Sequence, residues 1–326
     1  IENWYARLPD LIIFDKQNFH AEFGWSKEPT PFQSRMDLNY KKIQEGESWG
    51  EKWESAWFHL NGEVPKNWSG EQIATDLDFS GEGLVFNSKG VAIQGITNGS
   101  IWDPNFARTR VPFIDKCVGG EKIELWVEAA ANSLFGVFTD PDPEEQSPKR
   151  HGWFDAKVEK MKFGIFDKDI WHLYLDARIL LGLVKHLDKK SVRRIRIIKS
   201  LNQCINAFAE NRSNAQAARD CLKIELKKCA SASDLKVSAI GHAHIDTGWL
   251  WPVRETVRKT ARTFATQLKI IDQYPQYIFG ASQPQHYQFM KDSYPEIYER
   301  VKAAVSNGNW ECQGGMWVEA DCNLIS

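Results

Sequence analysis

Three side chains that can bind a metal stand two residues apart in the stretch GHAHIDTGWLW, Gly241 to Trp251. They are His242, His244 and Asp246, and they follow directly on the apolar run Leu235 to Ile240. On extended backbone, residues at positions i, i+2 and i+4 project to one side, so their ligand atoms can converge. Because zinc accepts imidazole and carboxylate ligands when no thiolate is present, the pattern predicts a divalent metal site.

Two different pairs of ligands fit this stretch. His242 and His244 form an HxH pair, which after a first barrel strand is typical of amidohydrolase-type metal hydrolases. His244 and Asp246 form the other pair. A lone loop histidine is more simply a structural residue, and Asp-Thr-Gly is an ordinary turn, but two histidines and an aspartate so close together favour a metal. Spacing alone does not decide between the two pairs.

A second group of polar residues lies in the stretch GGMWVEADCN, Gly314 to Asn323. Glu319 and Asp321 are two residues apart, so both carboxylates can share one face of an extended segment. Cys322 follows directly, but a neighbouring carboxylate disfavours the reactive thiolate. We therefore predict that Cys322 packs rather than reacts.

The two stretches together resemble a known enzyme family. GHAHIDTGWLWP, followed about seventy residues later by GGMWVEADCN, is similar to the class II α-mannosidases, glycoside hydrolase family 38. The intervening ASQPQHYQF and YPEIYERVKAAVSNGNWE have that family's spacing, and SAWFHL, GEGLVF and AIQGIT resemble the amino-terminal β-domain of its bacterial and fungal cytosolic branch. The resemblance covers most of the chain from about Trp53 onward, as the amino-terminal portion of such an enzyme.

The resemblance implies a role for each of five residues. In this family a His-x-Asp pair at the first strand end binds zinc, which corresponds to His244 and Asp246. The aspartate of the second motif is both zinc ligand and nucleophile, which corresponds to Asp321. Trp249 would stack on the sugar in the -1 subsite, and His242 would only support the ligands. The implied activity is retaining hydrolysis of terminal α-linked mannose from oligosaccharides.

These roles agree with the chemistry of glycoside hydrolysis. A retaining enzyme needs one carboxylate to attack the anomeric carbon and a second carboxyl group, about 5 to 5.5 Å away, to protonate the leaving oxygen. Zinc can hold sugar hydroxyls while its charge keeps Asp321 ionised, so we expect the metal to clamp the substrate rather than activate water. Glu319 is the reserve candidate for a carboxylate role, although a hydrogen-bond acceptor beside the ligands is its simpler interpretation.

Residues 1–150 show the pattern of an antiparallel β-sandwich. Apolar residues alternate with their neighbours in three runs: Ala56, Phe58 and Leu60; Ile73, Leu77 and Phe79; Ile123, Leu125 and Val127. Turn signals such as Gly119-Gly120 separate the strands at short spacing. The stretch TDPDPEEQSPK, Thr139 to Lys149, cannot continue a sheet, so we place a domain boundary near 150.

Residues 151–233 are predicted to be a helical connecting segment. Apolar residues recur at spacings of three and four: Ile170, Leu173, Ala177, Leu180, Leu181, Val184, and later Ile198, Leu201, Ile205, Phe208. The basic run KKSVRRIRIIK, Lys189 to Lys199, falls inside this pattern. We expect it to form a solvated helix face, with Ile195 and Ile198 directed inward.

Residues 234–326 are predicted to begin a parallel α/β catalytic domain. An apolar run at 235–240, a long amphipathic helix ending at Tyr274-Pro275, and the runs Tyr277 to Ala281 and Asn309 to Gln313 indicate strands alternating with helices. In such sheets the ligand site lies beyond the carboxyl ends of the strands, where both motifs fall. We expect Arg254 and Glu255 to form the exposed first turn of the long helix.

Composition restricts the partners and the location. The 41 basic and 43 acidic residues nearly cancel, giving a net charge of -2, which does not attract nucleic acid or an anionic membrane. The six cysteines form no CxxC pair, so we predict reduced thiols in a cytoplasmic protein, and no run is apolar enough for a membrane helix. Homo-oligomerisation is left open. The 14 tryptophans suit carbohydrate and keep a non-catalytic sugar-binding module as a further alternative.

The chain departs from the family in its extent. Family members continue far beyond this point with a further zinc histidine, the general acid and large carboxy-terminal β-domains, whereas this sequence stops at Ser326. We therefore expect the chain by itself to bind zinc weakly and to have negligible activity. Because three strands cannot close the α/β layer, apolar surface should also remain exposed on the last segment.

Overall fold

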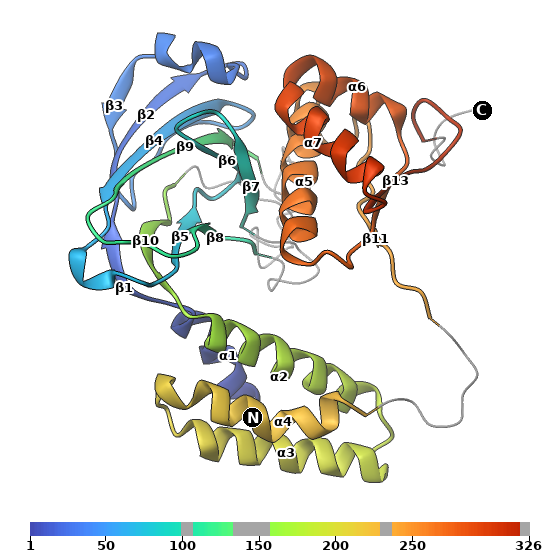
Figure 1. The fold of residues 1–326 in the computed structure, drawn as a ribbon. Coiled ribbons are helices and arrows are strands. Elements are labelled where there is room, and N and C mark those ends of the chain that lie inside the picture. Colours follow the sequence, from blue (N-terminus) through green and yellow to red (C-terminus); the bar gives the residue numbers. More distant parts are fainter. Residues whose placement is uncertain (99–106, 133–156, 229–236, 320–326) are drawn as a thin grey trace, which may run out of the picture.

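The computed structural model describes residues 1–98, 107–132, 157–228 and 237–319, and Figure 1 shows how they are arranged. A β-sandwich, a layer of helices and a small parallel sheet with its helices follow one another along the chain. This order confirms the predicted fold class.

The β-sandwich consists of two antiparallel sheets that enclose the first hydrophobic core. The strands of the six-stranded sheet, in spatial order, are β3 (Tyr40–Lys42), β2 (His20–Ser26), β4 (Ser55–Glu63), β9 (Lys122–Ala130), β6 (Glu82–Asn87) and β7 (Ala92–Thr97). Those of the four-stranded sheet are β1 (Ile13–Asn18), β10 (Lys160–Phe166), β5 (Ile73–Asp78) and β8 (Arg110–Ile114). Phe58 of β4 lies opposite Val127 of β9, and both belong to this core, which confirms the predicted alternation.

The outer side of the six-stranded sheet is also buried. Trp57 and Trp126, which alternate with the core residues, pack with Leu84 and Phe86 into a second cluster that includes the helix residue Phe264. The strands therefore have apolar residues on both faces, because one face meets the other sheet and the second face meets a helix.

The predicted boundary at 150 falls within residues 133–156, outside the described part of the chain. The strand that follows it, β10, pairs with β5 and with β1. The sandwich thus contains a strand from beyond that position. The division of the chain into 1–150, 151–233 and 234–326 stays a prediction.

Four helices form a layer next to the sandwich: α1 (Glu2–Leu11), α2 (Lys168–His186), α3 (Val192–Phe208) and α4 (Ala215–Leu226). Their apolar sides share one core, in which Trp4 of α1 contacts Phe208 of α3 edge to face. The expectation for the basic run is wrong in one respect, because Ile195 is 57% exposed and Ile197 is buried instead. The inward face of α3 is rotated from the one that we inferred.

The last described segment forms a parallel three-stranded sheet. Its strands are β11 (Gly241–His242), β12 (Phe279–Ala281) and β13 (Trp310–Cys312), in that spatial order, and its helices are α5 (Val253–Gln273), α6 (Pro284–Ser293) and α7 (Pro295–Ser306). The predicted strands and the helix end before Tyr274-Pro275 are confirmed, but β11 is only two residues long. Residues 237–240 are not part of the strand.

Helix α5 is buried on two sides, between the sandwich and α6–α7 (Figure 1). One stripe is apolar and includes Ala261, Phe264 and Leu268. The other stripe is charged, and six residues from α5 and the sandwich form what we call the buried ion cluster: Glu82, Glu128, Glu255, Arg258, Lys259 and Arg262. The expectation that Glu255 is exposed is therefore wrong, since it is 0% exposed.

Large apolar side chains are exposed on the last segment, as expected: Val237, Ile240, Trp249, Leu250, Val253, Ile278, Met316 and Trp317. No helix in the described residues is both long and apolar enough to cross a membrane.

Candidate metal and sugar site

The first motif forms the end of β11 and the loop that leads into α5, which we call the strand-end loop (residues 243–252). The backbone carbonyl of Asp246 accepts hydrogen bonds from the Trp251 indole, at 3.2 Å, and from the Thr256 hydroxyl, at 3.2 Å. Thr256 and Trp251 are buried, so these hydrogen bonds attach the strand-end loop to the first turn of α5.

The side chain of His244 lies between two carboxylates. Its Nε2 is 3.0 Å from Asp246 Oδ1, and its Nδ1 is 2.6 Å from Glu319 Oε2. Glu319 also accepts a hydrogen bond from the Ser282 hydroxyl, just after β12. The two motifs, far apart in the sequence, therefore meet at His244.

This arrangement fits a metal ion. A carboxylate that accepts the Nδ1 proton of an imidazole leaves Nε2 with a free lone pair, and the second nitrogen of a metal-binding histidine usually has such a partner. Asp246 Oδ1 lies on the Nε2 side, so an imidazole nitrogen and a carboxylate oxygen converge there. Both are donors that zinc accepts.

The remaining predicted ligands are placed differently. His242 belongs to β11, and its Nδ1 contacts the backbone oxygen of Gly280, on the neighbouring strand, at 2.9 Å. Asp321 and Cys322 lie outside the described residues. Within residues 1–98, 107–132, 157–228 and 237–319 no group of three or more His, Cys, Asp or Glu side chains is arranged to hold a metal.

Aromatic rings border the strand-end loop. Trp249 is 53% exposed, and its ring meets that of Trp251 edge to face, with centroids 5.2 Å apart. Trp317 of the second motif is 58% exposed, and its indole donates a hydrogen bond to Gln285 at 2.6 Å. Sequence reasoning did not single out Trp317, although its position inside the GGMWVEAD stretch was the available signal.

His286 of α6 is a further ionisable group that sequence reasoning missed. It is 3% exposed, and its Nε2 lies 3.2 Å from the Thr247 hydroxyl. Burial lowers the pKa of His286 to about 4, with His244 adding to the decrease and Glu319 opposing it. The imidazole therefore stays neutral beneath the strand-end loop at neutral pH.

Acid should destabilise the metal-free protein through His286. The pKa in the folded state, about 4, lies below the ordinary 6.5, so the unfolded chain takes up the proton first as the pH falls. The free energy of unfolding should be fully retained above pH 6.5 and decline toward pH 4. Urea unfolding of wild type and His286→Gln across this range checks the expectation. Between pH 6.5 and 4 the free energy of unfolding of the variant should fall by roughly 2–3 kcal/mol less than that of wild type. Equal losses would contradict it.

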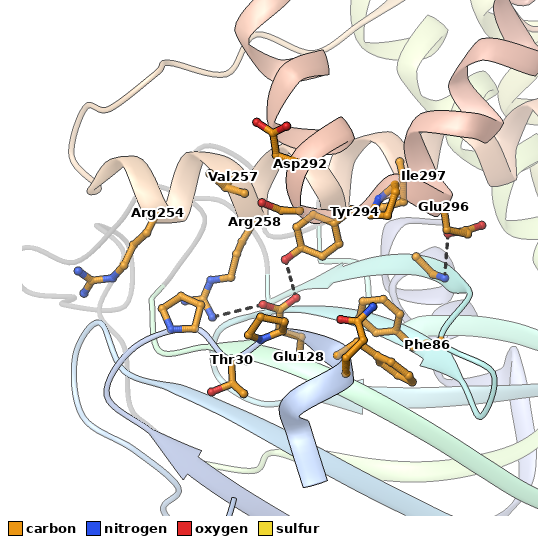
Figure 2. Close-up of a pocket in the computed structure, with 18 of the residues that line it drawn as sticks. Thr30, Phe86, Glu128, Arg254, Val257, Arg258, Asp292, Tyr294, Glu296 and Ile297 are labelled. Atoms are coloured by element: carbon orange, nitrogen blue, oxygen red, sulfur yellow. Dashed lines mark hydrogen bonds and ion pairs between the residues drawn. The ribbon is translucent and has the colours of Figure 1, made fainter. Parts of the chain in front are cut away.

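A separate cavity lies between the sandwich and the helices of the last segment (Figure 2). Tyr294 donates a hydrogen bond to Glu128 at 2.8 Å, and Arg258 lies 4.0 Å from the same carboxylate. None of the predicted site residues lines it. Two of its charged lining residues, Glu128 and Arg258, belong to the buried ion cluster, and the cavity is separate from the site of the two motifs.

Two family models match the chain. Residues 17–160 match the alpha-mannosidase jelly roll domain, and residues 234–326 match the N-terminal domain of glycosyl hydrolases family 38. The second match contains the strand-end loop and both sequence motifs.

Curated proteins similar to this chain are α-mannosidases. The chain is 34% identical over 329 residues to Alpha-mannosidase G of Dictyostelium discoideum, an alignment that covers 100% of the chain and 29% of that protein. It is 30% identical to Alpha-mannosidase 2C1 of Homo sapiens, over 92% of the chain and 28% of that protein. It is 26% identical to the Alpha-mannosidase of Saccharomyces cerevisiae, over 89% of the chain and 27% of that protein. The chain thus spans under a third of these relatives.

Proposed function

We propose that the protein containing this chain, which matches the family 38 N-terminal domain and the alpha-mannosidase jelly roll domain, is a retaining α-mannosidase that removes terminal α-linked mannose from oligosaccharides. One observation carries the proposal beyond the family. Within the family 38 domain, His244 Nε2 lies 3.0 Å from Asp246 Oδ1, and the other imidazole nitrogen, Nδ1, contacts the Glu319 carboxylate.

His244 and Asp246 are proposed to hold zinc, with Asp321 as the third ligand from this chain. Zinc, when bound, fixes sugar hydroxyls and favours the ionised nucleophile. Glu319 orients His244 by accepting the proton on Nδ1, while Ser282 holds Glu319 in turn. His242 supports the site from β11, where its ring bonds the neighbouring strand.

The sugar is proposed to stack on Trp249. An exposed indole offers a flat apolar surface that suits the apolar face of a pyranose ring, and the perpendicular Trp251 ring supports it from the side. Asp321 is the proposed nucleophile, which attacks the anomeric carbon.

The general acid and a further zinc ligand are proposed to come from sequence outside this chain, which spans 29% of the Dictyostelium relative. The 326 residues by themselves should therefore bind zinc weakly and have negligible activity. A cytoplasmic location remains part of the proposal, supported by four free thiols among the described residues: Cys117, Cys204, Cys221 and Cys312.

Zinc titration of histidine variants tests the proposed ligand pair. In the full-length protein, His244→Ala should abolish stoichiometric zinc binding, because it removes a ligand. His242→Ala should weaken zinc by at most about tenfold, because it removes only a supporting group. Metal content after dialysis measures both. Equal zinc loss in the two variants would instead favour an amidohydrolase-type HxH site.

A further inference from the structure

The hydroxyl of Thr256 uses its full hydrogen-bonding capacity on the strand-end loop. It donates to the backbone oxygen of Asp246 at 3.2 Å, and it accepts from the Gly248 N–H at 3.0 Å and from the Trp251 indole at 3.1 Å. A hydroxyl has one proton and two lone pairs, so all three are engaged. Thr256 is 0% exposed, which means that no water competes for these bonds.

The three partners of Thr256 are spread across the turn that carries the proposed metal and sugar contacts. Asp246 precedes the turn, Gly248 forms it with a φ of 81°, and Trp251 ends it. The N–H of Trp249 donates to the backbone oxygen of Trp251 at 3.1 Å, which closes the turn. The Thr256 hydroxyl and the Trp251 indole therefore both hold the backbone of Asp246, and the hydroxyl also holds Gly248, next to Trp249.

Helix α5 can act as a support because the sandwich holds it. Lys259, one turn after Thr256, contacts Glu82 of β6 and lies 4.6 Å above the Trp251 ring. Arg258 bonds Glu255 and donates to the Ser55 hydroxyl of β4 at 2.7 Å. These contacts are buried, so they hold the start of α5 against the six-stranded sheet.

We propose that Thr256 is a positioning residue of the metal site, which sets the Asp246 carboxylate against His244 from a helix anchored on the sandwich. The inference rests on the proposed function, because it needs a metal at His244 and Asp246. Thr256 itself touches neither metal nor sugar. Its effect should therefore be seen in zinc affinity rather than in the chemistry of an attacking group.

The chain offers a matched control on the same helix. Thr260 is also 0% exposed, but its hydroxyl donates only to the backbone oxygen of Thr256 at 2.8 Å, inside α5. Valine has nearly the shape of threonine and lacks the hydroxyl. Thr256→Val and Thr260→Val thus remove one buried hydroxyl each, and only the first removes contacts with the loop.

Zinc affinity of the full-length protein, measured by competition with a chromophoric chelator, tests the proposal. Thr256→Val should bind zinc about 10- to 100-fold more weakly, as is typical when a group behind a metal ligand is lost. Thr260→Val should stay close to wild type, and Thr256→Ser, which keeps the hydroxyl, should restore most of the affinity. Thermal unfolding of all variants reports the general loss of stability that Thr256→Val and Thr260→Val share.

The outcomes separate this inference from the proposed function. Equal zinc affinities of Thr256→Val and Thr260→Val would overturn the positioning role and leave the zinc ligands intact. A failure of Thr256→Ser to recover affinity would also count against it. If wild type itself bound no zinc, or bound it independently of His244, both the proposed metal site and the inference would be wrong.

Discussion

Replacing Asp321 by Ala in the full-length protein should lower the hydrolysis of an aryl α-mannoside by about 10³-fold or more. In retaining hydrolysis a carboxylate must attack the anomeric carbon, and no water can form the same covalent intermediate. The neighbouring Glu319 is poorly placed to substitute, because its two oxygens contact His244 and Ser282. The kcat should be measured at saturating zinc, so that weaker metal binding does not account for the loss.

Azide distinguishes a lost nucleophile from a lost metal ligand. In Asp321→Ala, azide can enter the space left by the carboxylate and attack opposite the leaving group, so mannosyl azide of inverted configuration should form. Glu319→Ala is the matched control, since Glu319 contacts His244 and its loss should be relieved by added zinc but not by azide. Rescue of Glu319→Ala by azide, without rescue of Asp321→Ala, would assign the nucleophile to Glu319.

Replacing Glu255 by Ala should cost about 3–5 kcal/mol of unfolding free energy, the usual effect of removing one partner of a buried ion pair. Burial alone would raise the pKa of Glu255, but Arg258 and Arg262 outweigh it and hold the pKa below its ordinary value. The carboxylate is therefore ionised, and without it the Arg258 guanidinium, 2% exposed, loses its closest counter-charge. Urea unfolding of the protein measures the change.

A surface pair on the same segment is the control for Glu255. Glu299 contacts Lys302 on α7, where both side chains are more than half exposed, so Glu299→Ala should leave the unfolding free energy nearly unchanged. A loss for Glu255→Ala no larger than that for Glu299→Ala would show that the buried ion cluster does not hold α5.

The sandwich and the parallel sheet could be predicted because each has a simple period. Alternating residues such as Phe58 and Leu60 identify strands, and the strand–helix–strand order from Tyr277 onward identifies a parallel sheet. Helix α1 was missed, since ENWYARLPDL is only 10 residues long with a proline inside, and its fold depends on packing against α2 and α3. Such tertiary support has no local sequence signal.

The burial of α5 could not be predicted from its charges. Val257, Ala261, Phe264 and Leu268 mark one inward face, which usually implies that charged residues on the other faces are solvated. The structure places Glu255, Arg258 and Arg262 against the sandwich instead. There the two arginines are neutralised by Glu255 on the same helix and by Glu82 and Glu128 on distant strands. The strand partners Glu82 and Glu128 lie more than 100 residues away from these arginines, beyond the reach of any periodicity.

The candidate site was partly predictable, because its donors are concentrated in two short motifs. The proximity of His244 and Asp246 follows from their spacing on extended backbone. The contact between His244 and Glu319, and the burial of His286 beneath the loop, depend on how β12 and α6 bring the second motif to the first. These details needed the three-dimensional structure.

The contact between β7 and α5 has a consequence for any separate sandwich. Gly95 of β7 donates its N–H to the Thr266 hydroxyl at 3.0 Å, and a side chain there would meet the backbone of Arg262. The helix thus covers an outer strand that would otherwise offer unpaired backbone groups to another molecule. A sandwich detached from α5 would present β7 as an open edge, a surface prone to strand-to-strand aggregation.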